Sequence, residues 1–582
     1  MNRREFIMAA MMAPAGAGPV KLEPLPLGRV RLRPGPFLDA AIANRKYMAS
    51  LPADRLLHTF RITAGLPTSA APLGGWEAPV NELRGHFTGH YLSACALRWS
   101  AFGDDEMKAR AGQLVAELAK CQKALGGLYL SAFPEEFFDR LRAGQNVWAP
   151  FYTLHKIMAG LLDVHQLCGN EQALAVLQGM AQWTSRWTQP LGDAHMARVL
   201  EREYGGMNDV LYNLYGLTKS EALMETAARF DHQRVFKPLA EGRDELKGLH
   251  ANTMIPKIIG AARRYEFTGE RRMRNIAETF WRTVTSHRCY CTGGTSNGES
   301  WATDPGHLSK ELSGYTQECC CTYNMLKLSR QVYGWTGDPR CMDYYERALV
   351  NGILGTIHPD DGMTVYYVPL QSGYWKLFGL PTEAFWCCTG SGTESFSKLA
   401  DTIYWRDGDG LRVNLYVASE LDWTEKKIRV VMDTRFPEEE TARLTIQGSA
   451  RFTLKLRIPE WTQPGGWVKV NGNPVDAFAD PGGAIILDRD WKDAETVELR
   501  LPMGSWQWRM PDDESLRAQM KGPLVMAADL GQEKTRATPT RPRSIPEYQS
   551  EPVKPPATPD GLTMKPLYQM IDRRYATYWK HS

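Results

Sequence analysis

One pattern dominates the chain from residue 37 to about residue 350. Helical segments of roughly 12–20 residues alternate with short breaks rich in Gly, Pro and Asn. Examples of these segments are 107–125, 151–168, 171–187, 210–230, 254–268, 272–287 and 323–333. Several end in a glycine stop, as in Cys168-Gly169-Asn170 and Thr268-Gly269. Many helices of similar length joined by short turns predict an α/α barrel or toroid. A helical solenoid is the alternative, but the segments show no constant repeat period.

The hydrophobic period changes from helix-like to strand-like near residue 400. Apolar and polar residues alternate in the segments 411–417, 427–432, 442–446, 452–458, 468–470 and 496–501. Turn residues separate these segments, for example Asp480-Pro481-Gly482-Gly483. Short alternating strands at this spacing predict a β-sandwich. Residues 29–34 alternate in the same way and predict one short strand far upstream.

These changes of pattern divide the chain into five parts. Residues 1–17 form a predicted leader and residues 18–36 an N-terminal strand and arm. Residues 37–403 form the helical barrel and residues 404–532 the β-sandwich. Residues 533–582 form a C-terminal arm rich in Pro, Thr and Arg, which predicts a long loop. Its last part, 568–579, is aromatic enough to predict that it docks on the protein.

The overall composition narrows the possible partners. The formal net charge is +3 over 582 residues, so the chain lacks the basic excess that a nucleic-acid partner requires. No stretch of 18 or more apolar residues follows the N-terminus, and none is therefore predicted to span a membrane. The 18 Trp residues are numerous, and either a large aromatic core or stacking platforms for sugar rings explains them.

The N-terminus has the composition of an export signal. Arg3 and Arg4 precede a short apolar segment and two small-residue cleavage candidates ending at Ala15 and Ala17. The arginine pair resembles a twin-arginine signal. We therefore predict a periplasmic or secreted protein.

The cysteines are grouped in a way that disulfides do not explain. Three of the 11 cysteines are consecutive at 319–321, and Cys387 and Cys388 are also adjacent. Adjacent cysteines rarely pair with each other because the geometry is strained. A twin-arginine route exports folded protein, so a thiolate–metal site could form in the reducing cytoplasm before export.

Two distant segments together predict one thiolate-rich metal site. Glu318 and Cys320 are two residues apart, so they can converge only before the helix that we expect to start near Tyr323. Cys387 and Cys388 would face opposite ways on a strand, which requires an irregular turn at this pair. Thiolates with a carboxylate are the donors that Zn²⁺ takes in proteins. Buried free cysteines are the alternative on spacing alone.

At this point the sequence resembles a known family, the β-L-arabinofuranosidases of glycoside hydrolase families 127 and 146. The motifs that carry the resemblance are Thr292-Gly293-Gly294-Thr295-Ser296-Asn297-Gly298-Glu299, Glu318-Cys319-Cys320-Cys321-Thr322-Tyr323-Asn324 and Phe385-Trp386-Cys387-Cys388. Further matches are Pro34-Gly35-Pro36-Phe37-Leu38, Asp54-Arg55-Leu56-Leu57-His58, Gly85-His86-Phe87-Thr88-Gly89-His90-Tyr91, Tyr152-Thr153-Leu154-His155-Lys156, Gly205-Gly206-Met207-Asn208-Asp209 and His250-Ala251-Asn252-Thr253. The matches cover residues 30–530 or so. The resemblance implies an (α/α)6-barrel with β-sandwich domains.

The resemblance also implies roles for individual residues. It implies that Zn²⁺ is held by Glu318, Cys320, Cys387 and Cys388. It further implies that Cys387 is the nucleophile and Glu299 the acid/base, and that His155 and His250 line the sugar pocket. We add that Tyr366 and Tyr367 could supply a hydroxyl near the nucleophile, and that Glu394 is either a supporting residue or a helix-start acid. An apolar setting that raises the pKa of Glu299 would help it to donate a proton.

The chain also departs from the family pattern. The interval between Glu299 and Glu318 is longer than we expect in family 127, and Cys388 is followed by Thr-Gly as in the family 146 type. The extra thiols Cys289, Cys291, Cys319 and Cys321 have no role that we can assign. Cys319 or Cys321 could compete with Cys320 for the metal, and the Glu-x-Cys spacing favours Cys320.

We therefore predict an exported, zinc-dependent, retaining exo-glycosidase that removes β-L-arabinofuranosyl units from plant-derived glycans. A hydrolase of another furanoside or of a rare pectic sugar is the nearest alternative. A polysaccharide lyase and a non-catalytic carbohydrate-binding protein on the same scaffold are alternatives from other classes. The sequence does not indicate an oligomeric state.

Overall fold

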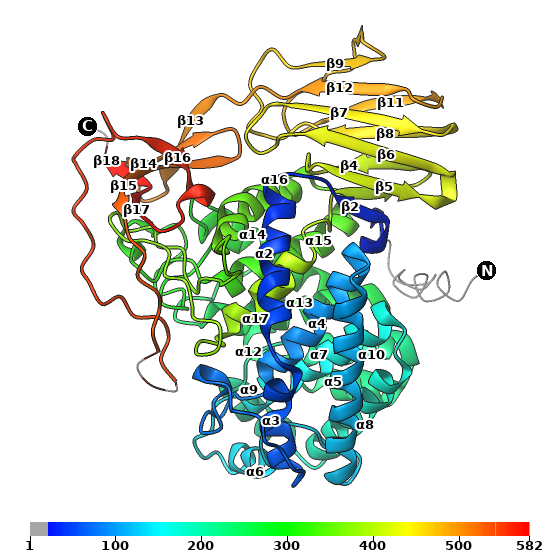
Figure 1. Cartoon of the computed structure of the whole chain (residues 1–582), viewed down its shortest axis with the longest axis vertical. Coiled ribbons are helices and arrows are strands. Elements are labelled where there is room, and N and C mark those ends of the chain that lie inside the picture. Colours follow the sequence, from blue (N-terminus) through cyan, green and yellow to red (C-terminus); the bar gives the residue numbers. More distant parts are fainter. Residues whose placement is uncertain (1–20, 540, 542, 581–582) are drawn as a thin grey trace.

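The computed structural model describes residues 21–539, 541 and 543–580. The predicted twin-arginine leader therefore lies outside the described residues. Figure 1 shows helices filling the larger part of the molecule, with strands stacked over one end and a long C-terminal arm along one flank. In the described part of the chain, no helix has both the length and the apolar character needed to cross a membrane.

Six helices form a closed inner ring, and each contacts the next one around the ring. They are α4 (His86–Phe102), α7 (Pro150–Cys168), α10 (Met207–Thr218), α13 (Ala251–Thr268), α15 (Cys319–Thr336) and α17 (Cys387–Ser397). Each inner helix is covered by an outer one: α5 (Asp105–Ala124), α8 (Glu171–Thr188), α11 (Glu221–Ala228), α14 (Arg271–His287), α16 (Pro339–Ala348) and α2 (Pro36–Ser50), respectively. The shorter helices α3 (Ala53–Thr63), α6 (Glu136–Arg142), α9 (Asp193–Arg202) and α12 (Gln233–Ala240) lie in the connections. This arrangement confirms the predicted (α/α)6-barrel.

Small residues allow the inner helices α4 and α7 to pack closely. A methyl group added at Gly160 of α7 would lie 2.4 Å from the carbonyl oxygen of Gly89 on α4. Gly169 ends α7 in a left-handed conformation (φ 70°), as its glycine stop predicted. The predicted helix 210–230 is instead two helices, because Lys219 adopts a left-handed φ of 56° and ends α10 without a glycine.

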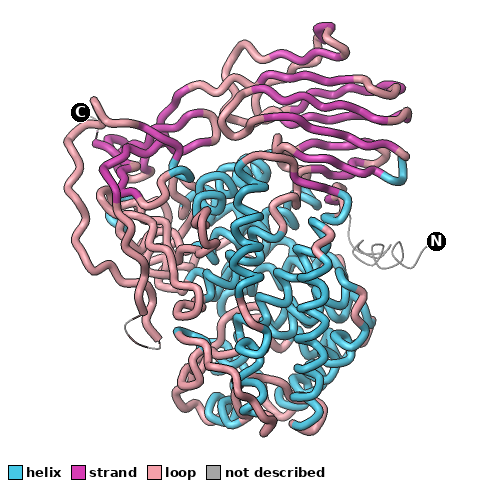
Figure 2. Tube along the Cα trace, in the orientation of Figure 1, coloured by secondary structure: helices cyan, strands magenta, loops and turns pink. Residues whose placement is uncertain are grey.

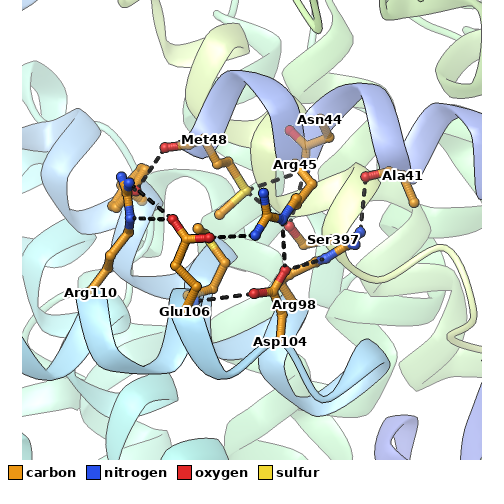
Figure 3. A network of polar contacts seen from close by, with 11 residues as sticks. Ala41, Asn44, Arg45, Met48, Arg98, Asp104, Glu106, Arg110 and Ser397 are labelled. Carbon is orange, nitrogen blue, oxygen red and sulfur yellow. Dashed lines mark hydrogen bonds and ion pairs between the residues drawn. The ribbon is translucent and has the colours of Figure 1, made fainter. Parts of the chain in front are cut away.

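An ion-pair network fixes the outer helix α2 to its neighbours (Figure 3). The guanidinium of Arg45 on α2 lies 3.1 Å from Asp104, the residue that caps α5 through the backbone N–H of Met107. Arg98 of α4 donates to the same carboxylate at 3.3 Å and to the carbonyl oxygen of Ala41 at 2.9 Å. One capping carboxylate thus joins three helices.

Figure 2 shows the strands gathered at one end of the helices. The two sheets of the β-sandwich share one core. The seven-stranded sheet has the order β10 (Asn473–Val475), β9 (Trp467–Val470), β12 (Thr496–Arg500), β7 (Thr441–Gln447), β6 (Ile428–Thr434), β5 (Ser419–Trp423) and β2 (Val30–Leu32). The five-stranded sheet has the order β1 (Glu23–Pro24), β3 (Tyr404–Asp407), β4 (Gly410–Val413), β8 (Ala450–Arg457) and β11 (Ala484–Trp491). Leu444 of β7 and Leu454 of β8 are buried in the same cluster. The predicted upstream strand is β2, which pairs with β5.

A third sheet combines strands that precede the long segment 533–563 with strands that follow it. It contains β13 (Ser505–Met510), β14 (Asp513–Lys521), β15 (Leu524–Gln532), β16 (Met564–Pro566), β17 (Arg573–Ala576) and β18 (Tyr578–Lys580). The aromatic end of the chain is therefore docked as predicted, and Tyr578 and Trp579 are buried. The segment between β15 and β16 contains no helix or strand where it is described. Within it, the Tyr548 ring lies 4.6 Å from Tyr374 and 4.9 Å from Trp375.

A buried ion-pair cluster joins the barrel to the sandwich. Arg457 at the end of β8 is 3% exposed and lies 2.6 Å from Asp343 and 2.5 Å from Glu346, both on α16. It also donates to the carbonyl oxygen of Asn414 at 2.7 Å, in a segment predicted as strand that leaves the ladder after Val413. Two carboxylates at this interface therefore depend on one guanidinium.

Replacing Arg457 with Met is expected to lower the free energy of unfolding by about 3–5 kcal/mol, because it leaves two buried carboxylates without their cation. Urea or thermal unfolding measures the loss. Arg451→Met is the matched control, because Arg451 pairs with Asp488 and Asp490 at 56% side-chain exposure. Such surface pairs contribute about 0–1 kcal/mol. Equal losses in the two variants would contradict this account of the interface.

Candidate metal centre and active site

Both predicted metal-binding segments lie at the N-terminal ends of inner helices. Glu318 is the residue that precedes α15, with extended backbone angles (φ −63°, ψ 130°), and Cys320 lies in the first turn. Cys387 and Cys388 are the first two residues of α17. The two sequence expectations about local structure are therefore wrong. The helix begins at Cys319 rather than near Tyr323, and the cysteine pair begins a helix rather than occupying an irregular turn.

The helix starts explain how residues with unsuitable spacing converge. A residue just before a helix has non-helical angles, so its side chain need not follow the helical period. Gln317 before Glu318 and Phe385 before Trp386 both adopt left-handed angles, with φ of 59° and 52°. Residues other than glycine adopt this conformation rarely, and it clusters at functional sites. These two residues turn the chain sharply into α15 and α17.

The structure brings the four predicted ligands together. One donor atom from each of Glu318, Cys320, Cys387 and Cys388 lies within 4.8 Å of all the others, and all four residues are buried. The Sγ atoms of Cys320 and Cys388 are 3.2 Å apart, and Glu318 Oε1 lies 3.7 Å from Cys387 Sγ. No other group of His, Cys, Asp and Glu in the described residues has this arrangement.

The chemistry of this group fits a divalent metal ion. Burial, and then the negative charge of neighbouring groups, raises the pKa of the Glu318 carboxyl well above its usual value. Burial also raises the pKa of the Cys387 and Cys388 thiols. Among the described residues, Glu318 has no ion pair with Lys, Arg or His. Four such acids at one buried point can lose their protons together only if a cation compensates their charge. Three thiolates and one carboxylate are a donor set that zinc accepts.

The neighbouring extra thiols are outside this group. The Sγ atom of Cys321 lies 3.3 Å from Glu318 Oε2, whereas Cys387 and Cys388 lie near the other carboxylate oxygen, Oε1. Cys319 is 5% exposed and is not part of the four-donor group. The Glu-x-Cys spacing therefore selects Cys320 over both neighbours, as predicted. Cys289 and Cys291 are also buried and free.

The hydroxyl of Tyr366 connects Cys387 with Glu299. It donates a short hydrogen bond to Glu299 Oε1 and lies 3.6 Å from Cys387 Sγ. The other carboxylate oxygen of Glu299 lies 3.6 Å from Nε2 of His250, which precedes α13. The Glu299 and His250 side chains are 24% and 27% exposed, whereas Cys387 is 6% exposed. The site therefore runs from a buried sulfur to a carboxylate that reaches solvent.

The environment of Glu299 differs from the expected apolar one. Burial alone would raise its pKa, but hydrogen bonds with His250 and Tyr366 outweigh burial and hold the pKa below its usual value. Glu299 also has a left-handed φ of 69°. Its carbonyl oxygen accepts from the backbone N–H of Ala251 at 2.7 Å, which fixes the loop against α13. The carboxylate is therefore ionised at neutral pH.

The two remaining predicted residues lie near the centre without contacting both reactive groups. Tyr367 packs against Tyr366 with ring centroids 4.6 Å apart, and its backbone bridges to Glu318. His155 lies in the first turns of α7, and its Nδ1 atom is 3.1 Å from the carbonyl oxygen of Tyr152. Among the described residues, no polar contact joins His155 to Cys387 or Glu299.

Sequence reasoning missed several buried polar groups on the inner helices α4 and α7. Tyr152 Oη, His86 Nε2 and His90 Nε2 are among the buried side-chain atoms that have no hydrogen-bond partner in the described structure. Burial, and then the charge of Cys387 and Cys320, raises the pKa of Tyr152 well above its usual value. Because buried polar atoms normally have partners, these atoms are available to a polar ligand or to water. The motifs around His86, His90 and Tyr152 were the available signal, but no role was assigned to these residues.

Comparison with known proteins shows the family to which the chain belongs. A family profile described as the β-L-arabinofuranosidase GH127 catalytic domain matches residues 29–401. The chain belongs to this family. The GH127 middle-domain profile matches residues 410–503. Members of the family are glycoside hydrolases, and this GH127 protein is therefore a glycoside hydrolase that acts on glycan substrates.

One curated relative and two solved structures extend the comparison. A "Non-reducing end beta-L-arabinofuranosidase" of Bifidobacterium longum subsp. longum is 24% identical over 504 residues, which are 75% of this chain and 74% of the relative. A GH127 β-arabinofuranosidase structure superposes with a TM-score of 0.75 at 19% identity, over 97% of this chain and 98% of the other. A GH127 β-L-arabinofuranosidase from Geobacillus stearothermophilus T6 has a TM-score of 0.70 at 17% identity, over 95% and 100% of the two chains. These structures support the fold of this GH127 protein.

Proposed function

We propose that this protein is a zinc-dependent, retaining exo-glycosidase that hydrolyses β-L-arabinofuranosides with Cys387 as the nucleophile. The observation that carries the proposal is the position of Tyr366, whose hydroxyl contacts both Cys387 Sγ and Glu299 Oε1. A retaining glycosidase needs a nucleophile and an acid/base at one anomeric centre. The name of the curated relative supports action at a non-reducing end.

In the first step, Cys387 Sγ attacks the anomeric carbon while the bond to the leaving oxygen breaks. Because Glu299 is ionised at neutral pH, it must first take up a proton; it then gives this proton to the leaving oxygen, and the sugar becomes a thioglycoside of Cys387. In the second step, Glu299 takes a proton from water, whose oxygen attacks the anomeric carbon and releases Cys387 Sγ. Glu318, Cys320, Cys387 and Cys388 would hold Zn²⁺, which when bound supplies the positive charge that keeps the cysteines as thiolates.

The polar atoms without partners supply a place for the sugar hydroxyls. Tyr152 Oη and His86 Nε2 are buried and have no hydrogen-bond partner among the described residues, and the two rings pack together with centroids 5.9 Å apart. A furanose bound there would satisfy such atoms, which otherwise cost about 1–3 kcal/mol each when buried unpaired. A lyase or a non-catalytic binding protein has no need of the thiol–carboxylate–tyrosine arrangement around Cys387. Export through the predicted leader and a plant-derived substrate complete the proposal.

Metal analysis of protein purified without chelator tests this function. We expect about one Zn²⁺ per chain, because one four-donor group is present in the described residues. Removing the metal with a chelator should abolish hydrolysis of p-nitrophenyl β-L-arabinofuranoside, and adding Zn²⁺ should restore it. Protein that is fully active with no bound metal would refute the zinc part of the proposal.

A further inference from the structure

A buried polar group lies directly behind the metal-binding turns. Glu394 is 9% exposed, and its Oε1 atom lies 2.5 Å from Nδ1 of His90, which is 1% exposed. Its Oε2 atom accepts a short hydrogen bond from the hydroxyl of Tyr323, which is 5% exposed. We call these three residues the Glu394 cluster. Its members come from three inner helices, α17, α4 and α15, and none of them is part of the four-donor group.

Glu394 and Tyr323 lie on the same helix faces as the metal ligands, but farther along α17 and α15. On α17, Cys387, Ser391 and Glu394 follow the spacing i, i+4, i+7 and therefore share one face. On α15, Cys320 and Tyr323 are three residues apart and also share a face. Ser391 Oγ lies 3.0 Å from Cys320 Sγ, so the two faces meet at the sulfur atoms. The bond between Tyr323 and Glu394 joins the same two faces one turn deeper.

His90 fixes the cysteine-bearing turn from the third side. A methyl group added at Gly390 would lie 2.2 Å from Cδ2 of His90, so the imidazole fills the space beside this turn. Gly390 is two residues from Cys388 and donates its N–H to the carbonyl oxygen of Trp386. The imidazole therefore contacts the backbone that carries both cysteines.

The charge states of Glu394 and His90 determine which group donates and which accepts in the hydrogen bonds of the Glu394 cluster. Burial lowers the pKa of His90 to about 3, so the ring is neutral at neutral pH. Burial alone would raise the pKa of Glu394, but the interactions with His90 and Lys156 outweigh it and hold the pKa well below its usual value. An ionised carboxylate thus accepts from Nδ1–H of neutral His90 and from the hydroxyl of Tyr323.

We propose that Glu394 is a positioning residue that sets the separation between the ligand turns of α15 and α17, and thereby the place of Cys387 Sγ beside Glu299. The inference rests on the proposed metal-dependent mechanism. In this role Glu394 contacts neither the four-donor group nor the substrate, and it affects the reaction only by positioning other residues. This role requires that the Glu394 carboxylate keep both of its hydrogen bonds at the same time. His90 and Tyr323 are the partners through which it does so.

Glu394→Gln tests the proposal while keeping the side-chain volume. We expect kcat to fall about 10–100-fold with an unchanged KM, and the affinity for Zn²⁺ to fall by a similar factor, as for other residues that orient metal ligands. In Co²⁺-substituted protein, the visible and thiolate-to-cobalt absorption bands should shift, because these bands report the arrangement of the sulfur ligands. Tyr323→Phe removes one of the two bonds and should change the same properties in the same direction by less.

Glu266→Gln is the matched control, because Glu266 is also 9% exposed on an inner helix but lies on α13, which carries no ligand. It should keep the wild-type kcat and cobalt spectrum, whatever its effect on melting temperature. If Glu394→Gln lowers only the melting temperature and leaves kcat and the cobalt spectrum unchanged, the positioning role is wrong. Wild-type protein that binds no metal would instead refute the proposed function itself.

Discussion

Replacing Cys387 with Ser is expected to lower kcat on p-nitrophenyl β-L-arabinofuranoside by on the order of 10⁴-fold or more, the scale of losing a nucleophile. A serine hydroxyl at this position is both a weaker nucleophile and a poorer zinc ligand than a thiolate. Because a C–O bond is shorter than a C–S bond, the serine oxygen would also lie farther from the other ligands than the sulfur, which is 3.7 Å from Glu318 Oε1. The variant should therefore lose covalent chemistry and part of its metal affinity.

Two further variants separate these losses. Cys388→Ser removes a ligand and keeps the nucleophile, so excess Zn²⁺ should partly restore its activity, whereas Cys387→Ser should stay inactive when fully loaded with zinc. Cys319→Ser is the matched thiol control, because Cys319 is 5% exposed and Cys387 is 6% exposed, but Cys319 is outside the donor group. Substantial turnover by zinc-loaded Cys387→Ser would contradict the assignment of the nucleophile.

Much of the fold could be predicted because its signals are local and repeated. Helices such as α7 and α8 are bounded by glycine and asparagine signals, and their predicted limits agree with the structure to within a residue. The single predicted helix 210–230 failed because Lys219 ends α10 in a conformation usually taken by glycine. The strand predicted at 411–417 was too long, because the carbonyl oxygen of Asn414 pairs with the Arg457 side chain rather than with a strand.

The ligand set could also be predicted, but not the way in which the ligands converge. The spacing argument treated Glu318 and the cysteine pair as parts of regular elements or irregular turns. In the structure the ligands converge because they lie at the starts of two helices. Gln317 and Phe385, which precede these starts, have left-handed backbone angles. Such backbone angles depend on the surrounding packing, because propensity disfavours them for these residues. A hydroxyl near the nucleophile was predicted for Tyr366 and Tyr367, but the bond from Tyr366 to Glu299, 67 residues away in the chain, had no local signal.

Replacing Glu299 with Gln is expected to lower kcat/KM by about 10²–10⁴-fold on natural glycosides, whose leaving oxygens need a proton. With the p-nitrophenyl glycoside, the good leaving group makes the first step less dependent on Glu299. The second step still lacks its base, so the glycosylated form of Cys387 should accumulate. Intact-protein mass spectrometry should then show the added mass of one pentosyl unit, with the modification located at Cys387.

The pH profile of the wild-type protein provides an independent test of the same carboxyl group. Glu299 must be protonated in the first step, and its pKa is held below its usual value by His250 and Tyr366. The protonated fraction therefore falls as pH rises through this pKa, and kcat/KM for a natural glycoside should fall with it, because kcat/KM reports groups of the free enzyme. Glu299→Gln should remove this dependence, since an amide does not titrate.

Glu311→Gln separates the role of Glu299 from a general effect on its loop. Glu311 accepts a hydrogen bond from Asn297 at 3.3 Å in the same region, but it contacts neither Tyr366 nor Cys387. It should keep both the pH dependence and normal turnover. Added azide should accelerate Glu299→Gln, because an anionic nucleophile can resolve the covalent intermediate without a general base, and the product should be the glycosyl azide with retained configuration. A Glu299→Gln variant that keeps the wild-type pH profile would show that another group donates the proton.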